Sequence, residues 1–260
     1  NLAGDLVAGM IKRNLVRECD KSVRGRGRPS IPVEIETANT HILGLALRPG
    51  WVQVGKINLR GQGIGTPKRS EVPEPQRLVQ TATRLLESQL AAETFAVGVS
   101  VTGFVDAEHQ RLLLSSALRG LPDADLSPMF RRMEDRSILI RNDMHALAAR
   151  WLLTQHTFSD ASIDEDALLV LLDDGQVGST LLINGRPNDG CVMGANEMGH
   201  MRFRVKTDLC YCGAVGCIER IFSSEYARAR LGMVGHLRDM VARYDGRRGP
   251  MGEMISLVSN

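Results

Sequence analysis

Three cysteines and one histidine in the second half of the chain have types and spacing suited to metal binding. Cys210, Cys212 and Cys217 fall within eight residues, and His200 lies ten residues before the first of them. Three thiolates and one imidazole make a closed tetrahedral set, as in structural zinc sites that leave no position for water. The alternative is a group of free thiols, either buried or reactive. We expect a structural zinc ion at these four residues.

Two carboxylates flank this group. Glu197 precedes His200 by three residues, and Glu219 follows Cys217 by two. A bound metal would hold both glutamates in fixed positions, and carboxylates accept charge-assisted hydrogen bonds from neighbouring hydroxyls. The pattern therefore indicates a polyol-binding site, although the same glutamates could equally be ion-pair partners at the surface.

A third polar group, Arg141, Asn142 and Asp143, stands between a predicted strand at 138–140 and a predicted helix. Asn or Asp at this place can cap the amides of the helix, which is a purely structural role. In α/β folds, however, ligands usually bind at the carboxyl ends of strands. Asp143 could there act as a general base on a sugar hydroxyl.

The elements that must position these residues can be predicted from apolar periodicity. Strand-like and helix-like segments alternate, which is typical of an α/β domain with a mixed or largely parallel sheet. A Pro-rich connection is expected between residues 59 and 76. The predicted strands are 42–47, 52–59, 95–101, 138–140, 168–172 and 180–183, and the predicted helices are 76–92, 144–152 and 224–244.

The chain begins with a predicted amphipathic helix and a basic loop. Apolar residues recur at helical spacing from Leu2 to Val16, and residues 18–32 are polar and rich in Gly and Arg, as in a mobile loop. Seven basic and three acidic side chains give residues 1–31 a charge of +4, which leaves −2 on the rest of a chain of net charge +2. This asymmetry favours a polyanion partner, although a basic run can also be a solvated tail.

Composition narrows the class of protein. A chain of 260 residues with 43% hydrophobic content is long enough to bury a sizeable core, which argues against disorder of the whole chain. No long apolar run and no signal peptide are found, so we expect a cytoplasmic protein without a membrane segment. Cys19 and Cys191 stand apart from the other three cysteines, which does not suit a disulfide framework.

These motifs resemble those of the ROK family, whose name stands for repressors, open reading frames and kinases. The resemblance rests on Glu-x-Gly-His within 190–200, on Cys-x-Cys-Gly-x-x-Gly-Cys-x-Glu at 210–219, on Asn142 with Asp143, and on 98–106. It spans most of residues 33–225. It implies the two-lobed actin-like or hexokinase-like ATPase fold, which is related to ribonuclease H.

The resemblance also implies roles for individual residues. Asp143 would occupy the position of the catalytic base in the kinases. The residues implied to contact a sugar are Asn142, Asp143, Glu197, His200 and Glu219. The residues implied to bind zinc are His200, Cys210, Cys212 and Cys217.

The phosphate-binding turns distinguish the kinases of this family from its regulators. The kinases need an Asp-x-Gly-Gly-Thr turn, where amides approach phosphate and the acid positions magnesium. Residues 45–51 read Leu-Ala-Leu-Arg-Pro-Gly-Trp instead, without an acid or paired glycines and with a proline that lacks an amide donor. The second loop, 173–180, keeps two glycines but adds the negative charges of Asp173 and Asp174, which would repel phosphate. We expect no functional ATP site and no enzyme activity.

Family regulators resemble winged helix-turn-helix proteins at their start. Residues 1–32 resemble the recognition helix and wing of such a DNA-binding domain, which leaves 33–260 as the sugar-sensing domain. The complete module needs residues before Asn1, and the adenosine loop of the family would lie beyond the C-terminus, so we expect truncation at both ends. The predicted DNA contacts are Lys12, Arg13, Arg24, Arg26 and Arg28.

The sequence therefore predicts a sugar-responsive, DNA-binding transcriptional regulator, a repressor of carbohydrate metabolism genes. The expected partners are operator DNA, a sugar or sugar-phosphate inducer, and further copies of the chain in a homodimer or tetramer, because half-sites on DNA are paired. Sugar binding is expected to change the angle between the two lobes and with it the spacing of the DNA-binding heads. The alternatives are a divergent ROK sugar kinase that phosphorylates a hexose with ATP, and a sensor or scaffold with neither activity.

Overall fold

The structure, a computed structural model, divides the chain into two compact units, Asn1–Asp143 and Met144–Asn260. The division falls inside the predicted sugar-sensing domain, at the start of helix α3 (Asp143–Phe158). The residues that the structure describes are 2–19, 31–115, 117–118, 120–121, 123–133, 135–158, 166–173, 175–188, 190, 195–237 and 239.

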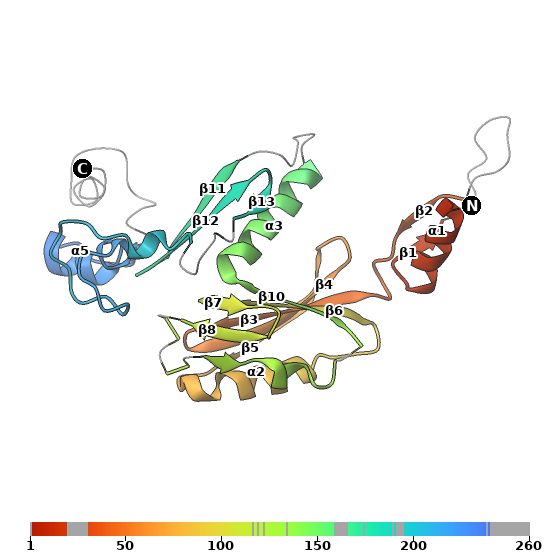
Figure 1. The fold of residues 1–260 in the computed structure, drawn as a ribbon, viewed down its shortest axis with the longest axis horizontal. Helices are drawn as coiled ribbons and strands as arrows, with labels where there is room; N and C mark the ends of the chain where they lie inside the picture. The colour runs from red at the N-terminus through yellow and green to blue at the C-terminus, as the bar shows by residue number, and fades with distance from the viewer. Residues whose placement is uncertain are drawn as a thin grey trace. The chain divides into compact units, whose positions relative to one another are not determined.

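The first unit opens with a helix and a two-stranded antiparallel sheet, drawn in red in Figure 1. They are α1 (Leu2–Lys12), β1 (Val16–Glu18) and β2 (Val33–Ile35). The helix predicted to reach Val16 ends earlier, because Asn14 adopts a positive φ of 54° and the chain then enters β1. Residues 20–30, which make up most of the predicted basic loop, lie outside the described residues.

A five-stranded mixed sheet forms the centre of the first unit (Figure 1). Its order is β10-β6-β3-β4-β5, in which β3, β6 and β10 are parallel while β4 and β5 are antiparallel to their neighbours. This confirms the predicted α/β class with a mixed sheet. The strands are β3 (His41–Arg48), β4 (Trp51–Asn58), β5 (Gly63–Glu71), β6 (Thr94–Val101) and β10 (Ser137–Asn142).

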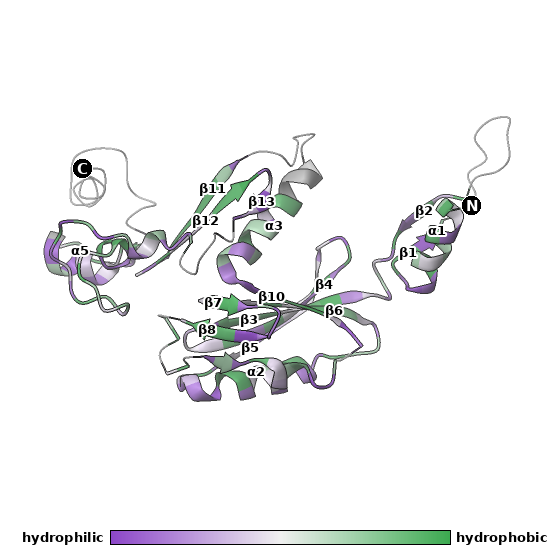
Figure 2. Ribbon diagram, in the orientation of Figure 1, coloured by the Kyte–Doolittle hydropathy of each residue, from purple (hydrophilic) through white to green (hydrophobic). Residues whose placement is uncertain are grey.

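The core of this unit lies between the sheet and helix α2 (Leu78–Glu87). Alternate residues of β3, from Leu43 to Leu47, are buried, as are residues one turn apart on α2, from Leu78 to Leu86. Each leucine among them contributes roughly 1.5–3 kcal/mol to the free energy of unfolding when it is fully buried. Figure 2 shows both green and purple segments along α2, as expected of a helix with one apolar face.

Strand β5 is the longest of several strands that the sequence prediction missed. We expected a Pro-rich connection there, but residues 63–71 pair with β4 at the edge of the sheet. An edge strand tolerates Pro67 because one side of its backbone needs no partner, and its exposed Lys68 and Arg69 are typical of such an edge. The remaining elements of the unit are η1 (Pro75–Arg77), η2 (Ser127–Phe130) and the small sheet of β7 (Phe104–Asp106), β8 (Arg111–Leu114) and β9 (Ala124–Asp125).

The second unit contains an antiparallel three-stranded sheet and short helices around the cysteine motif. The predicted strands 168–172 and 180–183 are confirmed within β11 and β12. The elements after α3 are β11 (Ala167–Asp173), β12 (Gln176–Ile183), β13 (Arg186–Pro187), η3 (Met198–His200), α4 (Ile218–Ile221) and α5 (Ser224–Leu231).

Helix α5 is shorter than the predicted helix 224–244. Ser223 caps its start by accepting a hydrogen bond of 3.1 Å from the amide of Tyr226. Gly232 ends it in a left-handed conformation with φ of 64°, which is the usual way for glycine to terminate a helix. None of the helices in the described ranges is long and apolar enough to cross a membrane.

Candidate functional site

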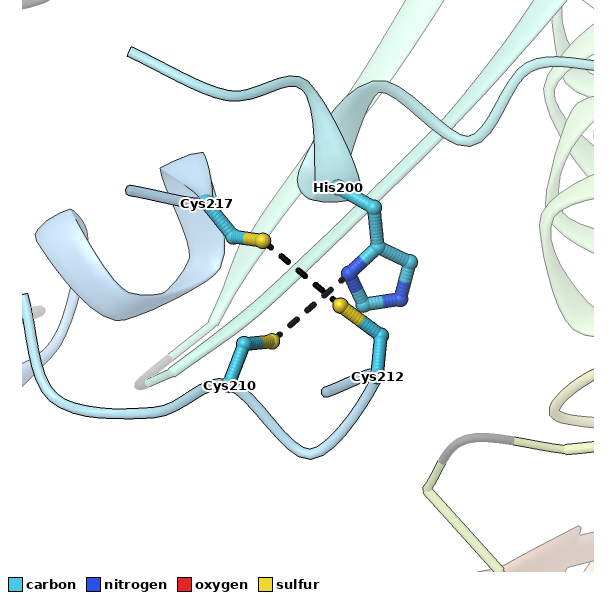
Figure 3. Close-up of side chains that lie close together, drawn as sticks. All are labelled: His200, Cys210, Cys212 and Cys217. Atoms are coloured by element: carbon cyan, nitrogen blue, oxygen red, sulfur yellow. Dashed lines mark hydrogen bonds between the residues drawn. The ribbon is translucent and has the colours of Figure 1, made fainter. Parts of the chain in front are cut away.

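The structure brings the predicted metal ligands together in the second unit. His200 comes from η3, and the three cysteines come from the loop that leads into α4, so that four side chains converge on one point (Figure 3). All four ligand atoms lie within 4.8 Å of one another. The Sγ atoms of Cys212 and Cys217 are 3.6 Å apart, and Sγ of Cys210 lies 3.7 Å from Nδ1 of His200.

These spacings fit a four-coordinate metal. Zinc–sulfur bonds of about 2.3 Å at tetrahedral angles place neighbouring ligand atoms roughly 3.8 Å apart. Both measured separations are close to that value. The donor set of soft sulfur and borderline nitrogen also has no open position for water, so the cluster can hold a metal ion in a closed site.

Two glycines permit the tight loop that carries the cysteines. Gly213 donates its amide to the carbonyl of Cys210 at 2.9 Å and adopts a φ of 88°, a conformation that favours glycine. Gly216 has the same φ, and a Cβ there would collide with the carbonyl of Phe203. The sequence motif therefore needs these glycines for backbone geometry as well as the cysteines for ligation.

The thiols differ in their readiness to ionise without a metal. Burial raises the pKa of Cys217 to about 12 and also raises the pKa of Cys210. Burial acts in the same direction on Cys212, but hydrogen bonds from the Ala214 amide and from the other two cysteines lower the pKa of this thiol. Metal binding must therefore displace protons from the buried pair.

The predicted carboxylates lie on either side of the His200 ring. Oε2 of Glu219 is 3.5 Å from Nδ1 of His200, and Oε2 of Glu197 is 3.9 Å from Nε2. Nδ1 is thus the ring nitrogen on the cysteine side, and Nε2 is the one nearest Glu197. The Glu219 side chain is 7% exposed, whereas that of Glu197 is 36% exposed, so Glu197 is the more accessible of the two to a ligand.

Tyr211 completes this group, and sequence reasoning did not select it. Its ring packs edge-on against that of His200, with 5.4 Å between centroids. Burial and a hydrogen bond with Glu219 raise the pKa of the Tyr211 phenol, so it stays a neutral donor. Its position between Cys210 and Cys212 was the one feature of the sequence that pointed to it, but no spacing rule assigns a role to a residue between two ligands.

Asn142 and Asp143 belong to the first unit, where the carboxyl ends of β3, β6 and β10 meet. Asn142 Nδ2 donates to the carbonyl of Gly103 at 2.8 Å. Oδ2 of Asp143 accepts a hydrogen bond of 2.9 Å from Thr102 Oγ1 and a direct bond from Arg48 Nη1. Arg48 and Thr102 were not predicted to take part in the site. The feature of the sequence that could have identified them is their position at the carboxyl ends of β3 and β6, which run parallel to β10.

The two segments that correspond to the phosphate turns of the kinases are a tight strand turn and a loop whose amides are hydrogen-bonded within the protein. In the first, Arg48 pairs with Trp51, so Pro49 and Gly50 form a tight turn between β3 and β4. In the second, the amides of Gly175 and Val177 donate to the carbonyl of Phe222 and to Oε1 of Glu219, both at 3.0 Å. These two amides are therefore already engaged.

The predicted DNA contacts fall partly outside the described residues. Arg24, Arg26 and Arg28 lie in 20–30, which the structure does not describe. Lys12 and Arg13 are exposed at the end of α1, and the Arg13 guanidinium stacks 5.5 Å from the centroid of Phe95.

The N-terminal elements are attached to the central sheet of the same unit. Thr40 Oγ1 donates to the carbonyl of Asn14 at 2.8 Å, and the amide of Glu36 donates to the carbonyl of Leu15 at 2.9 Å. The Thr40 bond and the Arg13–Phe95 contact attach the segment between α1 and β1 to the amino ends of β3 and β6, whereas the Glu36 bond extends the pairing of β1 with β2. Arg48 and Asn142 lie at the opposite ends of the strands.

The fold built on the five-stranded mixed sheet is the actin-like or hexokinase-like fold. A solved ROK family transcriptional regulator, a homologue of Escherichia coli Mlc, superposes with a TM-score of 0.65 at 19% identity, over 93% of this chain and 60% of that one. The chain belongs to the ROK family, whose model matches residues 57–242. The family and the actin-like or hexokinase-like fold predicted from the sequence are thereby confirmed, and the winged helix-turn-helix segment at 1–32 stays a prediction.

Curated relatives of this chain include both regulators and kinases. The transcriptional dual regulator NagC of Escherichia coli K12 is 25% identical over 237 residues, which cover 85% of this chain. A glucokinase of Streptomyces coelicolor is 24% identical over 187 residues, which cover 69% of this chain. The chain spans only 55% of the length of NagC and 56% of that of the glucokinase.

Proposed function

We propose that this chain is part of a sugar-responsive, DNA-binding transcriptional repressor of carbohydrate metabolism genes, without a working ATP site. The observation that carries the proposal is the state of the two phosphate turns. Pro49 has no amide to offer, and the amides of Gly175 and Val177 are hydrogen-bonded to internal acceptors. Phosphate binding in such loops depends on free amides, so a nucleotide has few donors here.

The metal in this proposal is zinc, in an architectural role. The four ligands are His200, Cys210, Cys212 and Cys217, and their closed geometry leaves no place for a reacting water. When bound, zinc would supply a fixed point to which the His200 ring is attached. Glu197 and Glu219 would then be held against a ring of fixed orientation, and Nε2 of His200 would remain as a hydrogen-bonding group.

The residues proposed to recognise the sugar are Asn142, Asp143, Glu197, His200 and Glu219. Carboxylates, an amide and an imidazole are the groups that accept and donate hydrogen bonds to a row of hydroxyls. Glu197 is exposed enough to reach a ligand, whereas Glu219 acts mainly by holding His200 and the Val177 amide.

DNA is proposed to bind at the N-terminal segment. The predicted wing is consistent with the antiparallel pairing of β1 and β2 on either side of residues 20–30, and α1 ends in exposed Lys12 and Arg13. The N-terminal segment is attached to the amino ends of β3 and β6, and Asn142 and Asp143 lie at the other end of the same sheet. The sheet is therefore proposed to transmit the effect of sugar binding to the DNA-binding segment. A homodimer or tetramer would place two such segments on paired half-sites.

A divergent sugar kinase is the second candidate, and the glucokinase relative favours it. One experiment separates the two. The intact protein is analysed for zinc, screened for thermal stabilisation by unphosphorylated and phosphorylated hexoses, and assayed for phosphate transfer from ATP to the same sugars. The proposal predicts about one zinc per chain, stabilisation by at least one sugar and no transfer. Phosphorylation of any hexose would establish the kinase instead.

A further inference from the structure

Arg48 lies in direct contact with the carboxylate of Asp143, and no part of the family motif accounts for it. Arg48 is the last residue of β3, Thr102 follows β6, and Asp143 follows β10, so the parallel strands bring all three to one edge of the sheet. Nη1 of Arg48 donates to Oδ2 of Asp143 and lies 3.4 Å from Thr102 Oγ1. Thr102 donates to the same Oδ2 at 2.9 Å.

The contact pairs two charges in a mostly buried place. The Asp143 side chain is 8% exposed and that of Arg48 is 21% exposed. A carboxylate so buried is costly to keep ionised unless a partner compensates its charge. Arg48 provides that compensation through the direct contact of its Nη1 with Oδ2 of Asp143. Thr102 adds a second donor to the same oxygen.

This arrangement suits a hydrogen-bond acceptor better than a general base. A base must take up a proton during each turnover, and Oδ2 of Asp143, which already accepts from Arg48 and Thr102, is not available for that proton. An ionised carboxylate of fixed orientation, in contrast, makes strong charge-assisted bonds to a hydroxyl. Arg48 lies in the segment where the kinases have their first phosphate-binding turn. The same residue therefore interrupts the phosphate motif and contacts Asp143, which stands at the position of the kinase base.

We propose that Arg48 is a positioning residue of the carbohydrate site, which holds the Asp143 carboxylate in one orientation as the acceptor for one hydroxyl of the bound sugar. This inference rests on the proposed function, since it presupposes that Asp143 contacts a sugar. Arg48 acts through Asp143 and not through a contact of its own with the ligand.

A double-mutant cycle tests the proposal. Binding of D-glucose and of N-acetyl-D-glucosamine is measured by calorimetry for the intact wild-type protein and for Arg48→Gln, Asp143→Asn and the double variant. Arg48→Gln should weaken the binding of whichever sugar the wild type takes by roughly tenfold or more, the range for a lost bond to a charged group. The double variant should bind no more weakly than Asp143→Asn alone, because Arg48 has nothing left to position.

Conservative and matched variants separate positioning from general damage. Arg48→Lys keeps the charge and should retain binding within a few-fold of the wild type. Arg84→Gln removes an exposed arginine of α2, outside the proposed site, and should leave binding unchanged. The melting temperature of Arg48→Gln should fall because the buried Asp143 carboxylate loses the charge of Arg48, and it should recover in the double variant.

The outcomes are distinct. Additive losses in the cycle would show that Arg48 contacts the sugar itself, and unchanged binding in Arg48→Gln would show that it has no part in the site; either result overturns the inference and leaves the proposed function standing. Failure of the wild type to bind either sugar would overturn the inference, whereas the proposed function is contradicted only if no hexose or hexose phosphate in the wider screen binds.

Discussion

The amide of Val177 donates a hydrogen bond of 3.0 Å to Oε1 of Glu219. This bond joins the start of β12 to the first turn of α4, directly after the last cysteine of the metal cluster. Gly199 lies against the same two residues so closely that a Cβ there would collide with the Val177 carbonyl and the Glu219 side chain. The start of β12 is therefore tied to the segments that carry His200 and the cysteines.

Removal of the Glu219 acceptor should destabilise the protein. Glu219→Ala leaves the buried Val177 amide without its partner, at a cost of roughly 1–3 kcal/mol in the free energy of unfolding. Glu219→Gln keeps an acceptor and should cost less. Denaturant unfolding provides the measurement, with exposed Glu225→Ala as the control. Equal stability of Glu219→Ala and the control would show that the bond contributes nothing.

Loss of one thiolate should release the metal. Cys212→Ser is expected to reduce bound zinc well below one per chain and to lower the melting temperature by on the order of 10 °C, since zinc binding contributes several kcal/mol to folding. A strong chelator should do the same to the wild type. Metal analysis measures the first effect and calorimetry the second. Cys19→Ser, outside the cluster, is the control. Full metal content in Cys212→Ser would refute the assignment of this ligand.

Glu197 should be needed for the response to sugar and not for DNA binding. Its side chain is 36% exposed and lies 3.9 Å from Nε2 of His200. Glu197→Ala should abolish sugar-induced release from operator DNA while leaving affinity for that DNA within about twofold, because nothing in the N-terminal segment changes. An anisotropy assay reports both quantities. A normal sugar response would remove Glu197 from the pocket.

The turn that joins β2 to β3 should make stability depend on pH in the acid range. Hydrogen bonds from the amides of Ala38 and Asn39 lower the pKa of Glu36 below its reference value of 4.5. A depressed carboxyl pKa contributes stability that is present above pH 4.5 and is lost as pH falls through the folded-state pKa.

Glu36→Gln lacks this contribution, so its stability should fall less than that of the wild type between about pH 5 and about pH 3. Urea unfolding at several pH values measures the difference, and exposed Glu108→Gln controls for substitutions elsewhere in the first unit. Parallel curves for Glu36→Gln and the wild type would contradict the prediction.

Much of the fold could be predicted because its signals are local. Alternating apolar residues identify β3 and β6, and the cysteine spacing identifies the cluster because a closed metal site constrains its own loop. The end of the helix predicted from residue 224 was wrong because apolar residues continue past Gly232. The left-handed backbone conformation of Gly232 ends the helix there.

The unpredicted parts depend on contacts between distant segments. Strand β5 contains a proline and charged residues, and only its pairing with β4 makes it a strand. Arg48 and Asp143 are 95 residues apart, and their contact follows from the parallel order of three strands. A single sequence gives the type of each residue but not which strands become neighbours.

The central claim is that sugar binding controls DNA binding, and a titration of fluorescent promoter DNA with the intact protein tests it most directly. The account predicts binding that weakens by orders of magnitude between about 50 mM and about 200 mM salt, since phosphate contacts release counterions. It also predicts that at least one hexose or hexose phosphate displaces the DNA. Affinity that no such sugar alters, or no binding even at low salt, would contradict it.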